Sequence, residues 1–225
     1  MAVQTLKSNA FIFDLDGTLI DTTPQVIKFW TDIAVEHNID PAKILETSHG
    51  RRTIETLQRW VPELATIEHV NELEGKLALE KDGVIVLPGV MNLLQSVSAK
   101  DWTVNTAGTN VMATTRLLQF NIQVPAKMAT GDMLTHGKPH PEGYLKAAEI
   151  LDKKPSECLV FEDAPSGVQA AIAAGMQCIA CTTTHTVEQL KAAGATVIVD
   201  RLNSVDIVGN EDGSYTTTIK NAYDL

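Results

Sequence analysis

Short apolar runs alternate with segments of helical spacing over most of the chain. Predicted strands lie at 10–14 (AFIFD), 102–106 (WTVNT), 127–130 (KMAT), 158–163 (CLVFED), 177–181 (QCIAC) and 196–200 (TVIVD). Predicted helices between them include NVMATTRLLQF, PEGYLKAAEIL, PSGVQAAIAAG and TVEQLKAAG, and the last two end at Gly175 and Gly194. This alternation predicts an α/β fold, in which helices cover both faces of a doubly wound, Rossmann-like parallel sheet.

The segment after the first predicted strand departs from this pattern. Between residues 21 and 87 the spacing is helical throughout, whereas a simple crossover between parallel strands needs only about a dozen residues. We therefore predict a helical cap formed by 21–87, inserted into an α/β core formed by 1–20 and 88–225. Within the cap, the run VNELEGKLALEKD is interpreted as the solvated face of an amphipathic helix.

The last residues of the chain have their own pattern. A turn is predicted at 211–213, followed by an alternating strand at 215–219 that we expect to be an antiparallel edge strand.

Composition narrows the partners of the protein. The net charge of −10 argues against DNA or RNA as the main partner, because that binding relies on clustered cations. No apolar run approaches the roughly 18 residues of a membrane span, and the N-terminus carries no apolar signal segment. We expect a cytoplasmic monomer that binds neither nucleic acid nor a membrane. Cys178 and Cys181 form a C-x-x-C pair, but a three-residue step along a strand places their side chains on opposite faces, so we interpret them as core residues.

Polar residues suited to catalysis follow the predicted strands or lie in the loops between them. They are Asp14, Asp16, Thr106, Lys138, Glu162 and Asp163. Because ligands of doubly wound sheets bind outside the carboxyl ends of the strands, we expect these side chains to meet at one sheet edge.

Two aspartates separated by one residue are suited to phosphoryl transfer. A carboxylate can attack phosphorus and hold the phosphoryl group covalently, and Asp14 is our candidate for this nucleophile. Asp16 lies two residues further on, where it can protonate the leaving alkoxide and later deprotonate the attacking water.

A carboxylate nucleophile beside a phosphate dianion requires nearby positive charge. We expect Mg²⁺ as the cofactor, held by Asp14, Glu162, Asp163 and the backbone carbonyl of Asp16. Lys138 would offset the remaining charge. The Thr106 hydroxyl and the Ala107 amide would donate hydrogen bonds to phosphate oxygens.

These motifs, in this order, resemble those of the haloacid dehalogenase superfamily. FDLDGTLIDT, the strand end at Thr106, GKPHPEGY and VFEDAPSGVQAAIAAG together resemble its phosphatase branch, in which a helical cap follows the first strand. The roles that this resemblance implies for Asp14, Asp16, Thr106 and Lys138 agree with those argued above. For Glu162 and Asp163 it likewise implies a magnesium site.

The cap sequence narrows the resemblance further. SHGRRTIETLQRWVPEL and KPHPEGY look like fungal phosphatases that act on 2-deoxyglucose 6-phosphate or glycerol phosphate. This likeness implies a small phosphorylated sugar or polyol as substrate, with His49, Gly50, Arg51 and Arg52 in a cap loop facing the phosphate. Ala107 and Gly108 would line the substrate site. We expect Arg52 to reach the substrate only when the cap closes.

Other interpretations remain open. A sugar phosphomutase needs the same site and only slower hydrolysis of the aspartyl phosphate. A non-catalytic regulator that binds a phosphorylated metabolite is less well supported, because a mere binder has no use for a nucleophile. His136 and His140 flank Lys138, and we interpret them as loop and helix-start residues rather than as ligands.

Overall fold

The computed structural model describes residues 3–224. Its central sheet has the strand order β5-β2-β6-β7-β8, and every neighbouring pair is parallel. The strands are β2 (Ala10–Phe13), β5 (Trp102–Val104), β6 (Cys158–Glu162), β7 (Gln177–Cys181) and β8 (Val197–Val199). The predicted α/β class and parallel sheet are confirmed.

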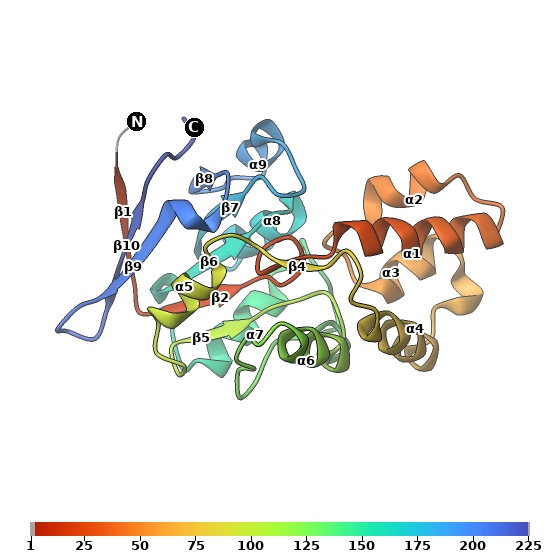
Figure 1. Ribbon diagram of the computed structural model, residues 1–225, viewed down its shortest axis with the longest axis horizontal. Coiled ribbons are helices and arrows are strands. Elements are labelled where there is room, and N and C mark those ends of the chain that lie inside the picture. Colours follow the sequence, from red (N-terminus) through yellow and green to blue (C-terminus); the bar gives the residue numbers. More distant parts are fainter. Residues whose placement is uncertain (1–2, 225) are drawn as a thin grey trace.

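Helices cover both faces of this sheet (Figure 1). One face packs against α5 (Val90–Gln95) and α6 (Asn110–Gln119), and the other against α7 (Glu142–Ile150), α8 (Pro165–Ala173) and α9 (Val187–Ala192). Neighbouring residues of a strand point to opposite faces of the sheet. Phe11 and Phe13 therefore belong to the apolar cluster on the face covered by α5 and α6, and Ile12 belongs to the cluster on the face covered by α7, α8 and α9. Cys181 and Cys178 divide between the same two clusters, which confirms their assignment to the core.

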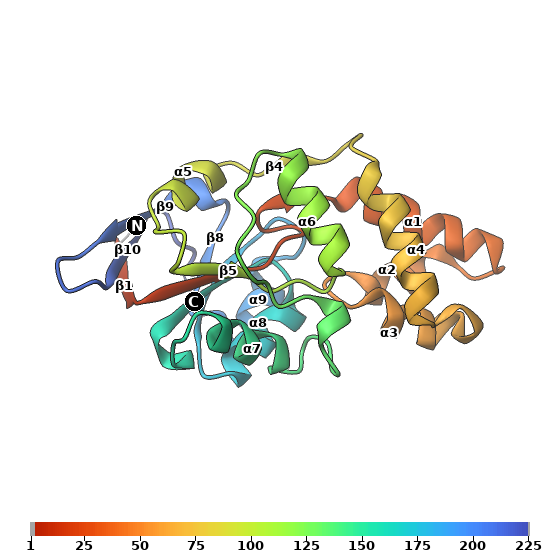
Figure 2. The same ribbon diagram turned by 90° about the horizontal axis from the view of Figure 1, so that it is seen from below.

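Four helices lie between the first strand of the sheet and α5, and Figures 1 and 2 show them gathered beyond one end of the sheet. They are α1 (Thr23–Glu36), α2 (Pro41–Ser48), α3 (Thr53–Trp60) and α4 (Ile67–Leu79), with the 3₁₀ turn η1 (Pro62–Leu64). Trp30, Ile44 and Leu57 belong to an apolar cluster of their own. The chain enters through β3 (Ile20–Asp21) and returns through β4 (Ile85–Val86), which pair antiparallel. The limits 21–87 remain our proposal for the cap.

Two predicted strands differ in the structure. KMAT at 127–130 is not a strand, because only Ala129 bridges to Asn105 before the chain turns into η2 (Gly131–Met133). The strand predicted at 215–219 exists as β10 (Tyr215–Ile219), but it is not an edge strand. It pairs on both sides, with β1 (Gln4–Ser8) and β9 (Val205–Gly209), in a separate antiparallel sheet.

The remaining short elements are the 3₁₀ turns η3 (Pro155–Glu157) and η4 (Leu202–Ser204). Gly175 and Gly194 follow α8 and α9 with φ of 80° and 94°, the left-handed geometry predicted for helix ends. None of the helices within residues 3–224 combines the length and the apolar character that crossing a membrane requires.

Candidate active site

Asp14 is the first residue after β2 and lies buried at the carboxyl edge of the sheet. Its backbone N–H donates to the Phe161 carbonyl at 2.9 Å, which continues the pairing with β6 by one residue. The chain then turns at Gly17, whose φ is 95° and whose N–H donates to the Ile20 carbonyl at 2.7 Å. A Cβ atom at Gly17 would lie 2.1 Å from Oδ2 of Asp163. Glycine therefore permits this turn and also lets it approach the second acidic strand end.

Lys138 lies between two buried carboxylates. Its Nζ donates to Asp14 Oδ1 at 2.5 Å and to Glu162 Oε1 at 2.6 Å. Burial alone lowers the pKa of this ammonium, but the charges of Asp14 and Glu162 outweigh that effect and raise it above its ordinary value. The lysine is thus a fixed positive charge beside Asp14.

Glu162 holds Lys138 in place. Its Oε1 accepts from Lys138 and from the Tyr144 hydroxyl at 2.7 Å, and its Oε2 accepts from the N–H groups of Asp163 and Ala164 at 2.9 and 3.1 Å. Burial favours protonation, but Lys138 and the other donors lower the pKa of Glu162. A Cβ atom at Gly167 would lie 1.7 Å from Oε1, so α8 passes this carboxylate only with glycine there. Sequence reasoning missed Tyr144, although it closes the GKPHPEGY motif.

The carboxylates at this edge form a group suited to a metal ion. Asp14, Glu162 and Asp163 each offer an oxygen, and these atoms lie within 4.8 Å of one another. Burial raises the pKa of Asp14 to about 7, although Lys138 opposes the shift, and burial also raises the pKa of Asp163 well above its ordinary value. Asp14 Oδ2 is buried without a hydrogen-bond donor from the described residues. A hard cation with oxygen ligands, such as Mg²⁺, fits this donor set and would stabilise the charged carboxylates.

A pocket opens above Asp14 between the sheet edge and the helices α1 to α4. Its core side is lined by Asp14, Asp16, Thr106, Ala107, Gly108 and Met112, and its other side by Val26, Phe29, Trp30, Ser48, His49, Gly50, Arg51, Thr53, Glu74 and Leu77. The structure therefore brings the predicted substrate-binding residues His49, Gly50, Ala107 and Gly108 to one pocket.

Several of these residues are placed by specific contacts. Asp16 Oδ1 accepts from the Thr22 hydroxyl at 2.8 Å, and the Thr106 hydroxyl accepts from the Gly108 N–H at 3.1 Å. Gly50 has φ of 70°, and a Cβ atom there would lie 3.1 Å from the side chains of Ala164 and Ser166. Burial lowers the pKa of His49, so the imidazole beside the pocket is neutral at pH 7.

Glu74 is a pocket residue that sequence reasoning missed. The solvated face predicted for VNELEGKLALEKD holds for Glu72 and Lys76, which form an exposed ion pair, but is wrong for Glu74. Val70, Glu74 and Ala78 are four residues apart, so α4 buries all three on one face. Glu74 Oε2 accepts from the Thr109 N–H at 2.7 Å, and burial raises its pKa. The four-residue spacing with Val70 and Ala78 was the signal in the sequence.

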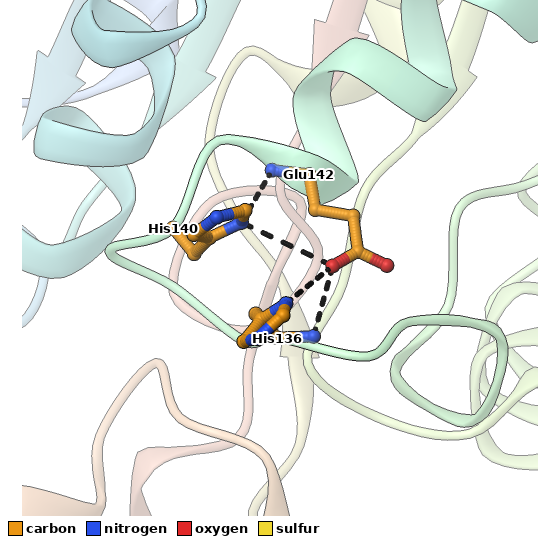
Figure 3. Close-up of side chains that lie close together, drawn as sticks. All are labelled: His136, His140 and Glu142. Atoms are coloured by element: carbon orange, nitrogen blue, oxygen red, sulfur yellow. Dashed lines mark hydrogen bonds and ion pairs between the residues drawn. The ribbon is translucent and has the colours of Figure 1, made fainter.

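The loop that carries Lys138 directs one side chain to the protein interior and others to solvent. The lysine side chain points inward and is 6% exposed, whereas those of His136 and His140 are 61% and 51% exposed. Figure 3 shows both imidazoles next to Glu142.

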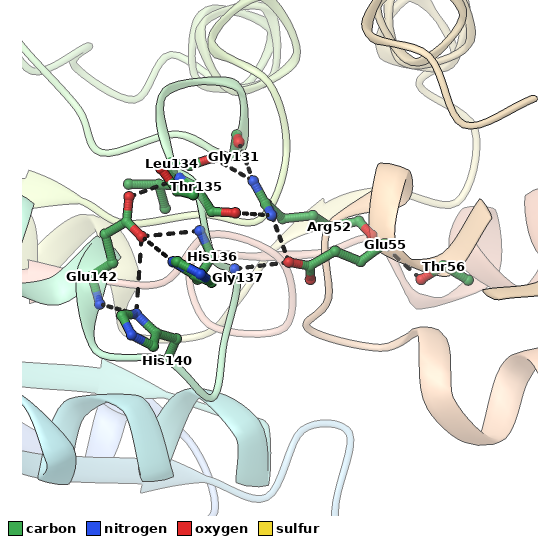
Figure 4. A network of polar contacts seen from close by, with 10 residues as sticks. All are labelled: Arg52, Glu55, Thr56, Gly131, Leu134, Thr135, His136, Gly137, His140 and Glu142. Carbon is green, nitrogen blue, oxygen red and sulfur yellow. Dashed lines mark hydrogen bonds and ion pairs between the residues drawn. The ribbon is translucent and has the colours of Figure 1, made fainter. Parts of the chain in front are cut away.

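Arg52 has other partners than the sequence predicted. It does not line the pocket above Asp14. Its guanidinium makes five hydrogen bonds, which is its full donor capacity. The acceptors are Gly131 O (3.2 Å), Leu134 O (2.5 Å), Thr135 O (2.8 Å) and Glu55 Oε1 (3.0 Å from Nε and 2.6 Å from an Nη atom; Figure 4). In this structure Arg52 therefore joins the cap to the core, and its contact with substrate remains a prediction.

Glu55 extends this contact toward the loop that carries Lys138. Its Oε1 also accepts from the Gly137 N–H at 2.9 Å, one residue before Lys138 (Figure 4). A Cβ atom at Gly137 would lie 2.5 Å from the Glu55 carboxylate. We call Arg52, Glu55 and the segment 131–137 the cap latch.

Comparisons with known proteins agree with this geometry. The chain is 35% identical over 217 residues to glycerol-1-phosphate phosphohydrolase 2 of Saccharomyces cerevisiae, covering 91% of this chain and 87% of that protein. It is 33% identical over 236 residues to 2-deoxyglucose-6-phosphate phosphatase 1 of the same yeast, covering 93% and 94%. A crystal structure of β-phosphoglucomutase from Clostridium difficile superposes with a TM-score of 0.73 at 28% identity, covering 87% and 92%.

The family assignment rests on most of the chain. A sequence model described as haloacid dehalogenase-like hydrolase matches residues 9–175, which include every acid, threonine and lysine of the site. The chain belongs to the haloacid dehalogenase-like hydrolase family.

Proposed function

We propose that this protein is a Mg²⁺-dependent phosphatase that hydrolyses a small phosphorylated sugar or polyol through an aspartyl-phosphate intermediate. The observation that carries the proposal is the buried Asp14 carboxylate. Its Oδ1 is held by Lys138 at 2.5 Å, and the residue lines the pocket. A carboxylate held in this way is oriented for nucleophilic attack.

The other residues supply charge and protons. The Asp14 carboxylate attacks phosphorus while Asp16 protonates the leaving alkoxide; Asp16 then takes a proton from the water that hydrolyses the aspartyl phosphate. Lys138 and the Thr106 hydroxyl stabilise the phosphoryl oxygens, together with the Ala107 amide.

We place the proposed Mg²⁺ ion among the acidic residues around Asp14. Asp14, Asp163 and the backbone carbonyl of Asp16 would hold Mg²⁺, which when bound offsets the negative charge of nucleophile and phosphate. Glu162 lies in the same acidic group, but both of its oxygens already accept hydrogen bonds from protein donors. We therefore assign Glu162 mainly to positioning Lys138.

The substrate class is supported by the pocket and by the named relatives. Ser48, Thr53 and Glu74 offer hydrogen-bonding groups from the cap, and Phe29 and Trp30 offer apolar surface. Glu74 is suited to accept hydrogen bonds from substrate hydroxyl groups. The two yeast relatives are named as phosphatases of a polyol phosphate and of a sugar phosphate.

A sugar phosphomutase is the alternative, favoured by the similarity to a β-phosphoglucomutase structure. The enzyme would be incubated with sugar and polyol monophosphates and Mg²⁺, and its products identified by phosphorus NMR. We expect inorganic phosphate and the free alcohol. An isomerised sugar phosphate would instead identify a mutase, and unchanged substrates throughout would overturn both. A cytoplasmic monomer acting on free metabolites remains our prediction.

A further inference from the structure

The exposed side of the Lys138 loop carries three side chains that can bind a metal ion. His136, His140 and Glu142 each offer one ligand atom, and these atoms lie within 4.8 Å of one another. The Nδ1 atoms of His136 and His140 lie 3.0 and 3.9 Å from the same oxygen, Oε2 of Glu142. The two imidazole rings face each other at a centroid distance of 4.6 Å, as Figure 3 shows.

The backbone holds the glutamate of this group in position. Glu142 Oε1 accepts from the Thr135 N–H at 2.7 Å, and Oε2 accepts from the His136 N–H at 2.9 Å. The carboxylate therefore fixes the start of the loop against the first turn of α7. The imidazoles are more than half exposed, and both Nδ1 atoms contact this residue: that of His136 lies 3.0 Å from Oε2, and that of His140 accepts from the Glu142 N–H at 3.3 Å. The anchored glutamate therefore defines the point where the two rings converge.

The distances between the candidate ligand atoms are close to those between the ligands of a bound Zn²⁺ ion. Ligands at about 2.0–2.1 Å from a tetrahedral Zn²⁺ lie about 3.3 Å from one another. The observed separations of 3.0 and 3.9 Å bracket this value, and small rotations of the exposed rings would adjust them. Solvent can supply the remaining ligands because the group faces outward.

The ligand types select the class of ion. Two imidazoles with one carboxylate suit late first-row divalent ions, whereas Mg²⁺ prefers oxygen ligands alone. The group around Asp14 is buried and consists of carboxylates, so the two sites differ in chemistry. They also lie on opposite sides of the loop, since the Lys138 side chain points to Asp14.

We propose that His136, His140 and Glu142 form a second, solvent-facing site for a late first-row divalent metal ion such as Zn²⁺ or Cu²⁺. This inference is independent of the reaction proposed above. It assigns to His136 and His140 a role as ligands, which their place in the sequence alone did not suggest.

Titration calorimetry with Zn²⁺ in the presence of millimolar Mg²⁺ tests the site in the full-length protein. We expect His136→Asn and His140→Asn each to lower the affinity for one equivalent of Zn²⁺ by about tenfold or more. Even residues that only support the ligands of a metal site change metal affinity by about 10–100-fold. His69→Asn, a change of the same type on α4, should leave binding unchanged. Circular dichroism would verify that the variants are folded.

Cu²⁺ provides a second readout that is specific for nitrogen ligands. Its electron paramagnetic resonance spectrum should show coupling to imidazole nitrogen in the wild type and lose part of it in each histidine variant. Zn²⁺ binding that is equal in the wild type and both variants would overturn the proposal. An effect of only one of the two histidines would also overturn it, since the site requires both.

Discussion

The two sides of the pocket are built differently. On the core side, Asp14 lies beside Lys138, Glu162 and Asp163, all four are almost fully buried, and Lys138 and Glu162 are fixed by charged hydrogen bonds. The cap side takes its residues from separate helices and loops, and its burial ranges from the exposed Arg51 to the buried Glu74. The cap latch connects the two sides next to Lys138.

This difference indicates that the two sides of the pocket have different roles in binding. The core side can bind only what all phosphate monoesters share, namely the phosphoryl group, so its residues should affect every substrate equally. If the proposed function holds, the cap side contacts the part of the substrate that varies, so its residues should affect substrates unequally. Residues that merely hold the cap on the core should behave like core residues.

Asp14→Asn tests the core side most severely. The change keeps the shape of the side chain but removes the nucleophile, so kcat should fall by about 10⁴-fold or more for every substrate. Phosphate release would be measured on sugar, polyol and aryl phosphates, with the exposed Asp32→Asn as a matched control. Substantial turnover by folded Asp14→Asn would remove Asp14 from the reaction.

The pH dependence of Mg²⁺ binding tests the buried charge on the core side. Burial raises the pKa of Asp14 to about 7, so below that pH the carboxyl group keeps a proton that the ion must displace. The apparent Mg²⁺ affinity should therefore rise with pH, by up to about tenfold per pH unit from Asp14 alone, and Asp163, whose pKa burial also raises, adds to this rise. Titration calorimetry at several pH values measures this. An affinity that does not change with pH would contradict Asp14 as a ligand.

Arg52→Ala tests whether the cap latch acts on all substrates. Losing its hydrogen bonds to the core carbonyls should lower kcat/KM by about tenfold, from at least one charged hydrogen bond of about 1.5 kcal/mol. The loss should be equal for sugar, polyol and aryl phosphates. Arg59→Ala, a change of an exposed arginine on the helix that begins directly after Arg52, serves as the control. A loss confined to sugar or polyol phosphates would instead restore the substrate contact predicted from sequence.

Glu74→Gln tests the cap side by itself. The variant keeps the size of the side chain but replaces a charged acceptor by a neutral one, at a cost of about 1 kcal/mol. We expect kcat/KM to fall about fivefold for hydroxyl-rich substrates and to stay unchanged for a small aryl phosphate. Glu72→Gln, two residues earlier on the exposed face, is the matched control. Equal losses for all substrates would assign Glu74 to the structure of the pocket wall.

The local pattern of apolar and polar residues was sufficient to predict much of the α/β core. Apolar runs bounded by turns predicted the five parallel strands, because each is a short buried segment. The carboxyl ends of parallel strands share one edge, so Asp14 and Asp163 were expected to meet, and the structure places them together. The strand predicted at KMAT was wrong, because a short apolar run does not show whether a neighbouring strand is free to pair with it.

Tertiary structure decided the contacts between distant segments. The sequence showed Arg52 as a charged residue near a helix start, but the carbonyls of 131–135 that receive its donors are assembled only when the cap folds onto the core. Glu74 likewise is buried because α4 packs beside α6 and meets the Thr109 N–H. A charged side chain becomes buried only where partners from elsewhere in the chain replace its water. The sequence by itself therefore predicted which residues gather at the sheet edge, while the folded chain determined which of them line the pocket.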